Sequence, residues 1–136
     1  MKRYDLTVRT YMTPAPHSVD MNQPLSVALN LMEEHGIRHL AVRESKKLAG
    51  VISERDIRFA LASDKRNSEQ LRVVDAYTVE PYVVDIETDL GAVAKKMAKE
   101  RFGCALVTEK GELAGIFTTV DACAALAEVL SGQHEQ

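Results

Sequence analysis

Apolar residues recur with the spacing of an amphipathic helix in two stretches of this chain, 24–35 and 89–101. A short extended apolar piece precedes each stretch, HSVDM at 17–21 and YVVDI at 82–86. Within each stretch the apolar positions fall at i, i+3, i+4 and i+7, as in Leu25, Ala28, Leu29 and Met32. Each predicted helix can therefore cover one face of a sheet.

Two apolar strands around a polar turn follow each predicted helix. The first pair is HLAVRE and LAGVIS around SKK, and the second pair is CALVTE and LAGIFT around KGE. A closing helix is then predicted to start at Ser53 or at Thr118. The predicted order, strand, helix, two strands and a closing helix, thus occurs twice along the chain.

The two halves are also related residue by residue. Segment 8–61 aligns with 73–126 without a gap, and 15 of the 54 positions are identical, where composition alone would give roughly four. The sequence therefore predicts a tandem duplication.

The duplication predicts where the parts of the chain begin and end. A unit of this length buries too little surface to be comfortable alone, so we expect the copies to pack about a pseudo-two-fold axis as one α/β (α+β) domain. The predicted parts are a first motif at 8–62, a polar linker at 63–72, a second motif at 73–130 and a polar tail at 131–136, all in one domain over 1–136.

Composition narrows the class of protein. The chain has 46% hydrophobic residues and a net charge of −3 without a basic patch, which favours a globular protein and disfavours a nucleic-acid partner. No apolar run approaches a membrane span and no signal peptide is visible, so a cytoplasmic protein without a membrane partner is predicted. Cys104 and Cys123 stand among small apolar residues and are predicted to pack in the core.

Motifs that carry chemistry are not evident in the sequence. It contains no GxGxxG, P-loop, GxSxG or HExxH pattern. His35 and His39 are four residues apart, but Gly36 between them is expected to end the helix, which disfavours a metal site. We therefore predict no catalytic residue, no metal ligand, no required cofactor and no enzymatic activity.

The strings GVISERDI and GIFTTVDA contain the pattern that best suits a ligand. A hydroxyl three residues before an acid fits a helix N-cap, although a capping box normally uses Glu or Gln at that position, so Asp56 and Asp121 are a weaker fit. The same helix start can also receive a phosphate, while the short carboxylate accepts hydrogen bonds from ribose hydroxyls. Both interpretations remain open from the residues alone.

The chain resembles the tandem cystathionine β-synthase (CBS) domain pair of stand-alone bacterial and archaeal proteins. The resemblance rests on YMTP at 11–14, on HGIRHLAV at 35–42 and on the Gly-apolar-apolar-[Ser/Thr]-x-x-Asp pattern of both copies. The second copy departs more, with AYTV at 76–79 and RFGCALV at 101–107. The resemblance implies two β-α-β-β-α units and two clefts that bind AMP, ADP or ATP, with S-adenosylmethionine less expected.

The resemblance also implies which residues bind the ligand. Asp56 and Asp121 would hold ribose hydroxyls, and Ser53 and Thr118 would contact ribose or phosphate. The other implied ligand-binding residues lie on the first and second strands of each unit: Ser18, Val19, Ile37, Arg38, His39, Leu40, Val83, Val84, Phe102, Gly103, Cys104 and Ala105.

The two predicted sites differ in charge. Arg38, Arg55 and Arg58 could neutralise phosphate, whereas the matching positions of the second copy are Gly103, Val120 and Cys123. We therefore expect unequal affinities, with at most one site favouring a highly charged nucleotide.

The expected function is regulatory. An adenosine-type ligand would change the conformation of the pair, and an effector protein would read the change. The last helix is apolar over most of its circumference, which predicts a homodimer. The alternative is a structural dimerisation or scaffold module that binds no ligand.

Overall fold

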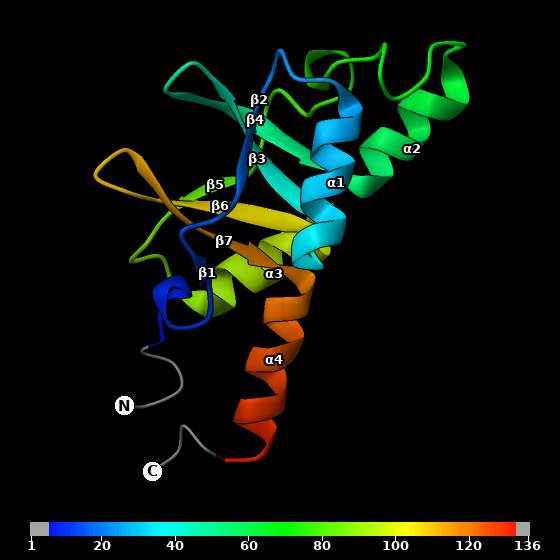
Figure 1. Cartoon of the computed structure of the whole chain (residues 1–136). Coiled ribbons are helices and arrows are strands. Elements are labelled where there is room, and N and C mark those ends of the chain that lie inside the picture. Colours follow the sequence, from blue (N-terminus) through cyan, green and yellow to red (C-terminus); the bar gives the residue numbers. More distant parts are fainter. Residues whose placement is uncertain (1–5, 133–136) are drawn as a thin grey trace. The chain divides into compact units, whose positions relative to one another are not determined.

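The computed structural model describes residues 6–132 and divides the chain into two compact units. The α1–α2 unit is His17–Pro81, and the α3–α4 unit combines Met1–Pro16 with Tyr82–Gln136 (Figure 1). Part of the predicted tail, 133–136, lies outside the described residues.

The α1–α2 unit has the predicted order of elements. Its three-stranded sheet has the order β2-β3-β4, with β2 parallel to β3 and β3 antiparallel to β4. The elements are β2 (Ser18–Asp20), α1 (Leu25–His35), β3 (His39–Glu44), β4 (Lys47–Ser53), α2 (Glu54–Ser63) and a 3-10 turn, Val73–Asp75.

The α3–α4 unit repeats this β-α-β-β-α arrangement. Its sheet has the order β1-β7-β6-β5, with β5 parallel to β6 and the other pairs antiparallel. The elements are a 3-10 turn (Val8–Thr10), β1 (Thr13–Pro14), β5 (Val83–Asp85), α3 (Leu90–Glu100), β6 (Cys104–Glu109), β7 (Glu112–Thr118) and α4 (Thr119–Leu130).

Helices α1 and α3 end one residue before a left-handed backbone conformation. Gly36 has φ 64° after α1, as the sequence predicts, and Arg101 has φ 60° after α3. At the start of α3 the Asp89 carboxylate accepts a hydrogen bond from the Ala92 amide at 2.9 Å. Local caps thus fix both ends of α3.

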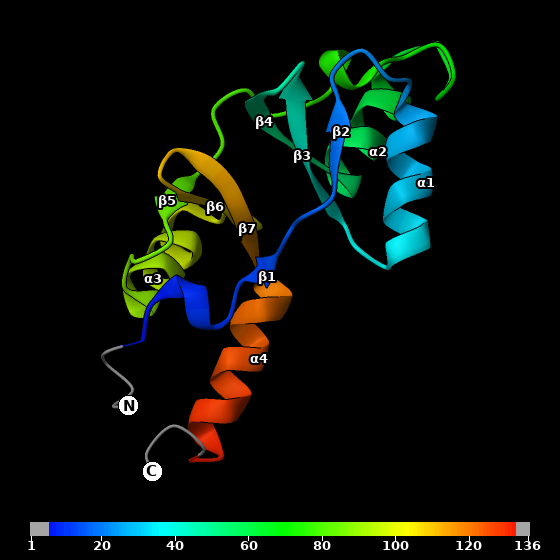
Figure 2. The ribbon, with the colours of Figure 1, turned by 60° about the vertical axis from the view of Figure 1, so that its left-hand side comes forward.

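The core of the α1–α2 unit forms between α1, α2 and one face of the sheet (Figure 2). Leu25, Leu40, Ile52 and Ile57 are fully buried there. Because Leu40 and Ile52 are register partners on β3 and β4, their side chains share the covered face. The α3–α4 unit has a matching core that contains Val93, Ala105, Val107 and Phe117.

Each unit is completed by the segment that opens the other sequence repeat. In the α1–α2 unit this segment begins within the last two residues of the predicted linker: Leu71 and Val73 are buried, and the Leu25 amide donates to the Leu71 carbonyl at 2.8 Å. In the α3–α4 unit it is residues 6–14, where the Val8 amide donates to the Thr88 carbonyl at 2.8 Å. We call residues 6–14 the N-terminal arm and 71–79 the central arm.

The two arms lie against the second strand of each hairpin, at a glycine. Thr78 of the central arm exchanges backbone hydrogen bonds with Val51, at 2.8 and 3.2 Å, and Thr13 of the N-terminal arm pairs with Ile116. A Cβ on Gly50 would collide with the Thr78 carbonyl oxygen and lie 2.8 Å from the Tyr77 ring. A Cβ on Gly115 would lie 2.9 Å from the Thr13 carbonyl oxygen. The glycines are required because backbone approaches backbone there.

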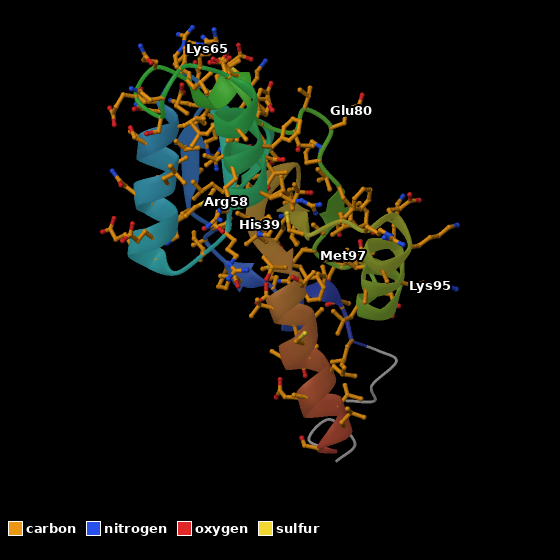
Figure 3. All side chains as sticks on the ribbon, turned by 90° about the vertical axis from the view of Figure 1, so that its right-hand side faces the viewer. His39, Arg58, Lys65, Glu80, Lys95 and Met97 are labelled. Atoms are coloured by element: carbon orange, nitrogen blue, oxygen red, sulfur yellow. The ribbon has the colours of Figure 1, made fainter. Side chains whose placement is uncertain are left out.

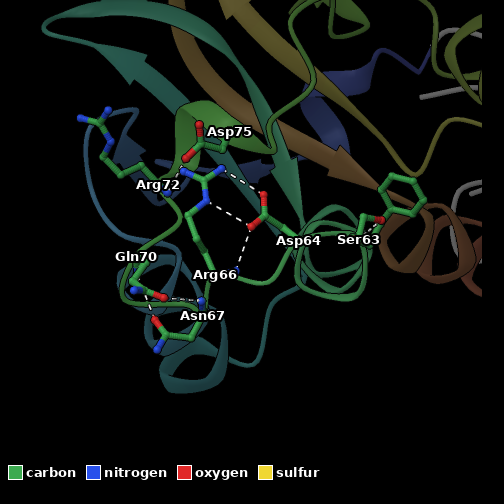
Figure 4. A network of polar contacts seen from close by, with 8 residues as sticks. Ser63, Asp64, Arg66, Asn67, Gln70, Arg72 and Asp75 are labelled. Carbon is green, nitrogen blue, oxygen red and sulfur yellow. Dashed lines mark hydrogen bonds and ion pairs between the residues drawn. The ribbon is translucent and has the colours of Figure 1, made fainter.

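The segment predicted as a linker is folded onto the α1–α2 unit (Figure 4). The Asn67 side chain accepts from the Glu69 and Gln70 amides at 3.0 and 3.1 Å. The Arg66 guanidinium beside Asp64 lowers the pKa of that carboxyl to about 2. These turns connect α2 to the central arm.

The prediction for the cysteines is confirmed for one of them. Cys104 is buried on β6, whereas Cys123 is exposed on α4 and was wrongly predicted to lie in the core. Its helix presents apolar residues on both sides, so an apolar neighbourhood in sequence did not indicate burial.

We predict that Gly50→Ala destabilises the protein by about 1–3 kcal/mol, because the new methyl group must push the Thr78 backbone away from β4. Gly91→Ala is the matched control: Gly91 lies in α3, where alanine is the better helix former and the nearest atom is a carboxylate oxygen of Asp89. Urea unfolding measures both. Equal midpoints for wild type and Gly50→Ala would contradict the close approach.

Candidate functional site

Both closing helices begin with a reciprocal capping box. The Asp56 amide donates to Ser53 Oγ at 3.0 Å while Asp56 Oδ2 accepts from the Ser53 amide at 2.9 Å. Thr118 and Asp121 make the same pair of bonds, at 3.3 and 2.9 Å. The expectation that aspartate fits this box poorly was wrong, because the backbone amide comes close enough for the shorter side chain.

The start of α2 lies beside the start of β3. His39 is the register partner of Ser53, and the Glu54 amide donates to the Arg38 carbonyl at 2.9 Å. Burial lowers the pKa of His39, opposed by the nearby Asp56 carboxylate and reinforced by the Arg38 charge. Figure 3 labels His39 and Arg58 in this unit. The structure thus brings Arg38, His39, Ser53 and Asp56 together.

A pocket of about 540 Å³ lies within the α1–α2 unit, between α2 and the segment that follows it. We call it the α2 pocket. It is lined by Arg55, Asp56, Phe59, Ala60 and Ser63 of α2, and by Asp64, Arg66, Leu71, Asp75, Ala76 and Tyr77. The central arm and the first turn of α2, which includes Asp56, therefore both contribute to the lining.

The charges of the α2 pocket are mixed. Two arginines and three aspartates line it, and Arg66 is paired with Asp64 at 3.0 Å. Arg55 has no ion pair among the described residues. Arg58 is absent from the lining and is paired with Glu54 at 3.5 Å. Arg55 is therefore the lining guanidinium available to an anion.

Several of the other predicted residues in this unit are engaged elsewhere. Ser18 Oγ accepts a hydrogen bond from Arg43 Nε at 3.2 Å. The side chains of Val19 and Leu40 lie in the core, and Ile37 is partly buried against it. Their roles in ligand binding stay predictions, and Val19 and Leu40 are buried as whole residues.

The predicted residues of the α3–α4 unit follow the same layout. Cys104 is the register partner of Thr118, and the Thr119 amide donates to the Gly103 carbonyl at 3.2 Å. Val83 is 43% exposed and Phe102 37% exposed, with the Phe102 ring 5.4 Å from that of Tyr82. The predicted residues whose side chains are buried are Val84, Cys104 and Ala105.

Thr13 of the N-terminal arm reaches the same helix start and was not among the predicted site residues. Its hydroxyl donates to the Asp121 carboxylate, 3.2 Å from Oδ1 and 3.4 Å from Oδ2. Thr118 Oγ1 also donates to Oδ2, at 3.1 Å. Thr13 and Thr78 are an identical pair in the repeat, which was the available signal, but the alignment does not show that each arm crosses to the other unit.

Membrane-spanning helices and metal-binding clusters are both absent from residues 6–132. Within that range no helix has the length and apolar character needed to cross a bilayer. The same range contains no group of three or more His, Cys, Asp or Glu side chains arranged to hold a metal ion.

The repeats match a known family. The model of the CBS domain matches residues 8–63 and again 73–128, so the chain belongs to the CBS-domain family and is a CBS-domain pair, the architecture of a regulatory module. A protein from Vibrio cholerae named for acetoin utilization (AcuB) has a structure with TM-score 0.84 and 30% identity, covering 96% of this chain and 97% of its own.

Two further relatives are a protein whose structure contains AMP and an enzyme. The structure of CBSX2 in complex with AMP has TM-score 0.74 and 28% identity, covering 90% of this chain and 97% of that one. The inosine-5'-monophosphate dehydrogenase of Korarchaeum cryptofilum is 33% identical over 105 residues, 76% of this chain. The chain spans only 21% of that enzyme's length.

We predict that His39 titrates below its ordinary pKa of 6.5, and that Asp56→Asn lowers its pKa further by removing the nearby negative charge. Arg38→Ala should have the opposite effect. Proton NMR of the histidine ring resonances over about pH 4–9, a range that brackets the ordinary pKa, measures these shifts. The resonance that is missing in His39→Gln is assigned to His39.

The depressed pKa has a consequence for stability. Below pH 6.5 the unfolded chain binds a proton that the folded chain resists, so stability falls as the pH drops through the two pKa values. His39→Gln should reduce this loss. An unshifted His39 pKa in all variants would contradict the burial of the imidazole beside α2.

Proposed function

We propose that the α1–α2 unit binds an adenosine nucleotide in the α2 pocket, with AMP as the preferred form. The observation that carries the proposal is the state of the Asp56 carboxylate. Oδ2 accepts a hydrogen bond from the Ser53 amide, whereas Oδ1 accepts none from the described residues, and Asp56 is one of the residues that line the pocket. A carboxylate oxygen held in this way can accept from a ribose hydroxyl.

The walls of the α2 pocket suit the remaining parts of such a ligand. Phe59 and Tyr77 offer aromatic surface to the adenine ring. Arg55, together with the positive end of the α2 dipole, offers attraction for a phosphate. The AMP held by CBSX2, a CBS-domain relative, supports the same class of ligand.

The charge of the α2 pocket favours a monophosphate over a triphosphate. Its lining carries two guanidinium groups and three carboxylates, a formal balance of 2 − 3 = −1. ATP carries two more phosphate groups than AMP, and their negative charge would face this acidic lining with one unpaired arginine, Arg55, so affinity should fall from AMP to ATP. This preference is compatible with the expectation that at most one of the two sites favours a highly charged nucleotide.

Binding in the pocket would serve a regulatory function without a chemical step. The ligand would favour one conformation of the pair by the difference between its affinities for the two states, and an effector protein would respond. The predicted self-association would serve the same function, and it is supported by the exposed apolar residues of α4, of which Val120, Leu126 and Leu130 are 58–77% exposed. The effector and the homodimer stay predictions.

Isothermal titration calorimetry with AMP, ADP and ATP tests the proposal. We expect AMP to bind most tightly, and Asp56→Ala to remove the tightest class of site, weakening it about ten- to a hundred-fold because a charged hydrogen-bond acceptor is lost.

Asp89→Ala is the matched control, since it also removes an aspartate that caps a helix start. Asp89 accepts a hydrogen bond from the Ala92 amide, and it belongs to the α3–α4 unit and not to the unit that holds the α2 pocket. Its AMP affinity should stay within about two-fold of wild type, because no ligand contact is lost. The absence of any AMP binding at millimolar concentration would refute the proposal, as would equal affinities for wild type and Asp56→Ala.

A further inference from the structure

The two capping aspartates differ in how fully their oxygens are used. Asp121 accepts from the Thr118 amide, from Thr118 Oγ1 and from Thr13 Oγ1, and both of its oxygens are occupied. Asp56 accepts from the Ser53 amide through Oδ2, and its Oδ1 has no partner among the described residues. The two helix starts are otherwise built alike.

The N-terminal arm causes the difference. Thr13 and Thr78 occupy equivalent positions of the repeat, and both lie against the second strand of a hairpin. Thr13 belongs to the two-residue strand β1 and its hydroxyl reaches Asp121. Thr78 makes an isolated bridge to Val51, and within residues 6–132 no hydrogen bond joins it to Asp56. The threonine hydroxyl thus bonds the capping aspartate in the α3–α4 unit, and no such bond is present among the described residues of the α1–α2 unit.

A carboxylate that already accepts a hydroxyl at Oδ1 is a poorer acceptor for an incoming one. A ribose hydroxyl would compete with the Thr13 hydroxyl for the lone pairs of Asp121 Oδ1, and any weakening of the Thr13 bond would offset part of the bond gained. At Asp56 a ribose hydroxyl would replace only water. Both acids are aspartates, so the predicted difference in ribose binding between Asp56 and Asp121 comes from the hydrogen bonds that each already makes within the protein.

We propose that Thr13 is a specificity-determining residue that sets the α3–α4 unit as the weaker adenosine site, because its hydroxyl occupies the Asp121 carboxylate that the ribose would use. This rests on the proposed function, in which these carboxylates accept ribose hydroxyls. Thr13 competes with the ligand from the protein side, and the N-terminal arm thereby controls the occupancy of the second site.

The test measures AMP binding by calorimetry in the full chain carrying Asp56→Ala, so that the remaining heat reports the Asp121 site. Adding Thr13→Val, which keeps the size and the β-branched shape but removes the hydroxyl, should raise AMP affinity about three- to ten-fold. Thr13→Ser keeps a hydroxyl and should leave the affinity low. Thr78→Val is the matched control at the equivalent position and should change nothing.

The outcomes separate this inference from the function on which it rests. If Thr13→Val leaves AMP affinity unchanged or weakens it, Thr13 does not compete with the ligand and the inference is wrong. AMP could bind to the wild type but to neither the Asp56→Ala variant nor the Asp56→Ala, Thr13→Val double variant. In that case the α3–α4 unit has no site, so the inference is wrong while the proposed function stands. If wild type binds no AMP, the proposed function fails and the inference falls with it.

Discussion

The close approach of an arm to a strand at Gly50 and at Gly115 is the constraint on which the rest of the structure depends. Without a side chain at these positions, the backbone of Thr78 or Thr13 can lie against the strand and extend its pairing. Each arm is the first segment of one sequence repeat but packs in the unit formed by the other, so neither β-α-β-β-α repeat supplies its own complete core. Leu71 and Val73 complete the core of the α1–α2 unit, and Leu6 and Val8 complete the core of the α3–α4 unit.

The same approach builds the candidate sites. The central arm contributes Ala76 and Tyr77 to the lining that also includes Asp56, and the N-terminal arm places the Thr13 hydroxyl on Asp121. The capping box and the ligand-binding interpretation of the two aspartates are therefore compatible. In both units Oδ2 holds the helix start. Oδ1 of Asp121 accepts a threonine hydroxyl, whereas Oδ1 of Asp56, a residue of the pocket lining, accepts no hydrogen bond from the described residues.

Much of this could be predicted from the sequence, because the repeat and the apolar periodicity are local signals. The helices, the paired strands, the stop at Gly36 and the hydroxyl-acid pairs at both helix starts followed from them. What could not be predicted is long-range pairing. Nothing in the spacing shows that Thr13 crosses to Asp121, or that the polar stretch after Ser63 folds onto its own unit through Asn67. The exposure of Cys123 was likewise hidden, since an apolar helix surface looks the same in sequence whether covered or open.

The central claim is that a helix start and an arm from opposite repeats together form one adenosine site. Backbone amide chemical shifts recorded during titration with AMP test it most directly. The account predicts that the largest shifts fall together on Asp56 and its helix start and on the central arm at Ala76 and Tyr77, with smaller shifts at Asp121 at higher AMP concentration. Shifts confined to either segment alone, or centred on residues outside the α2 pocket, would contradict it.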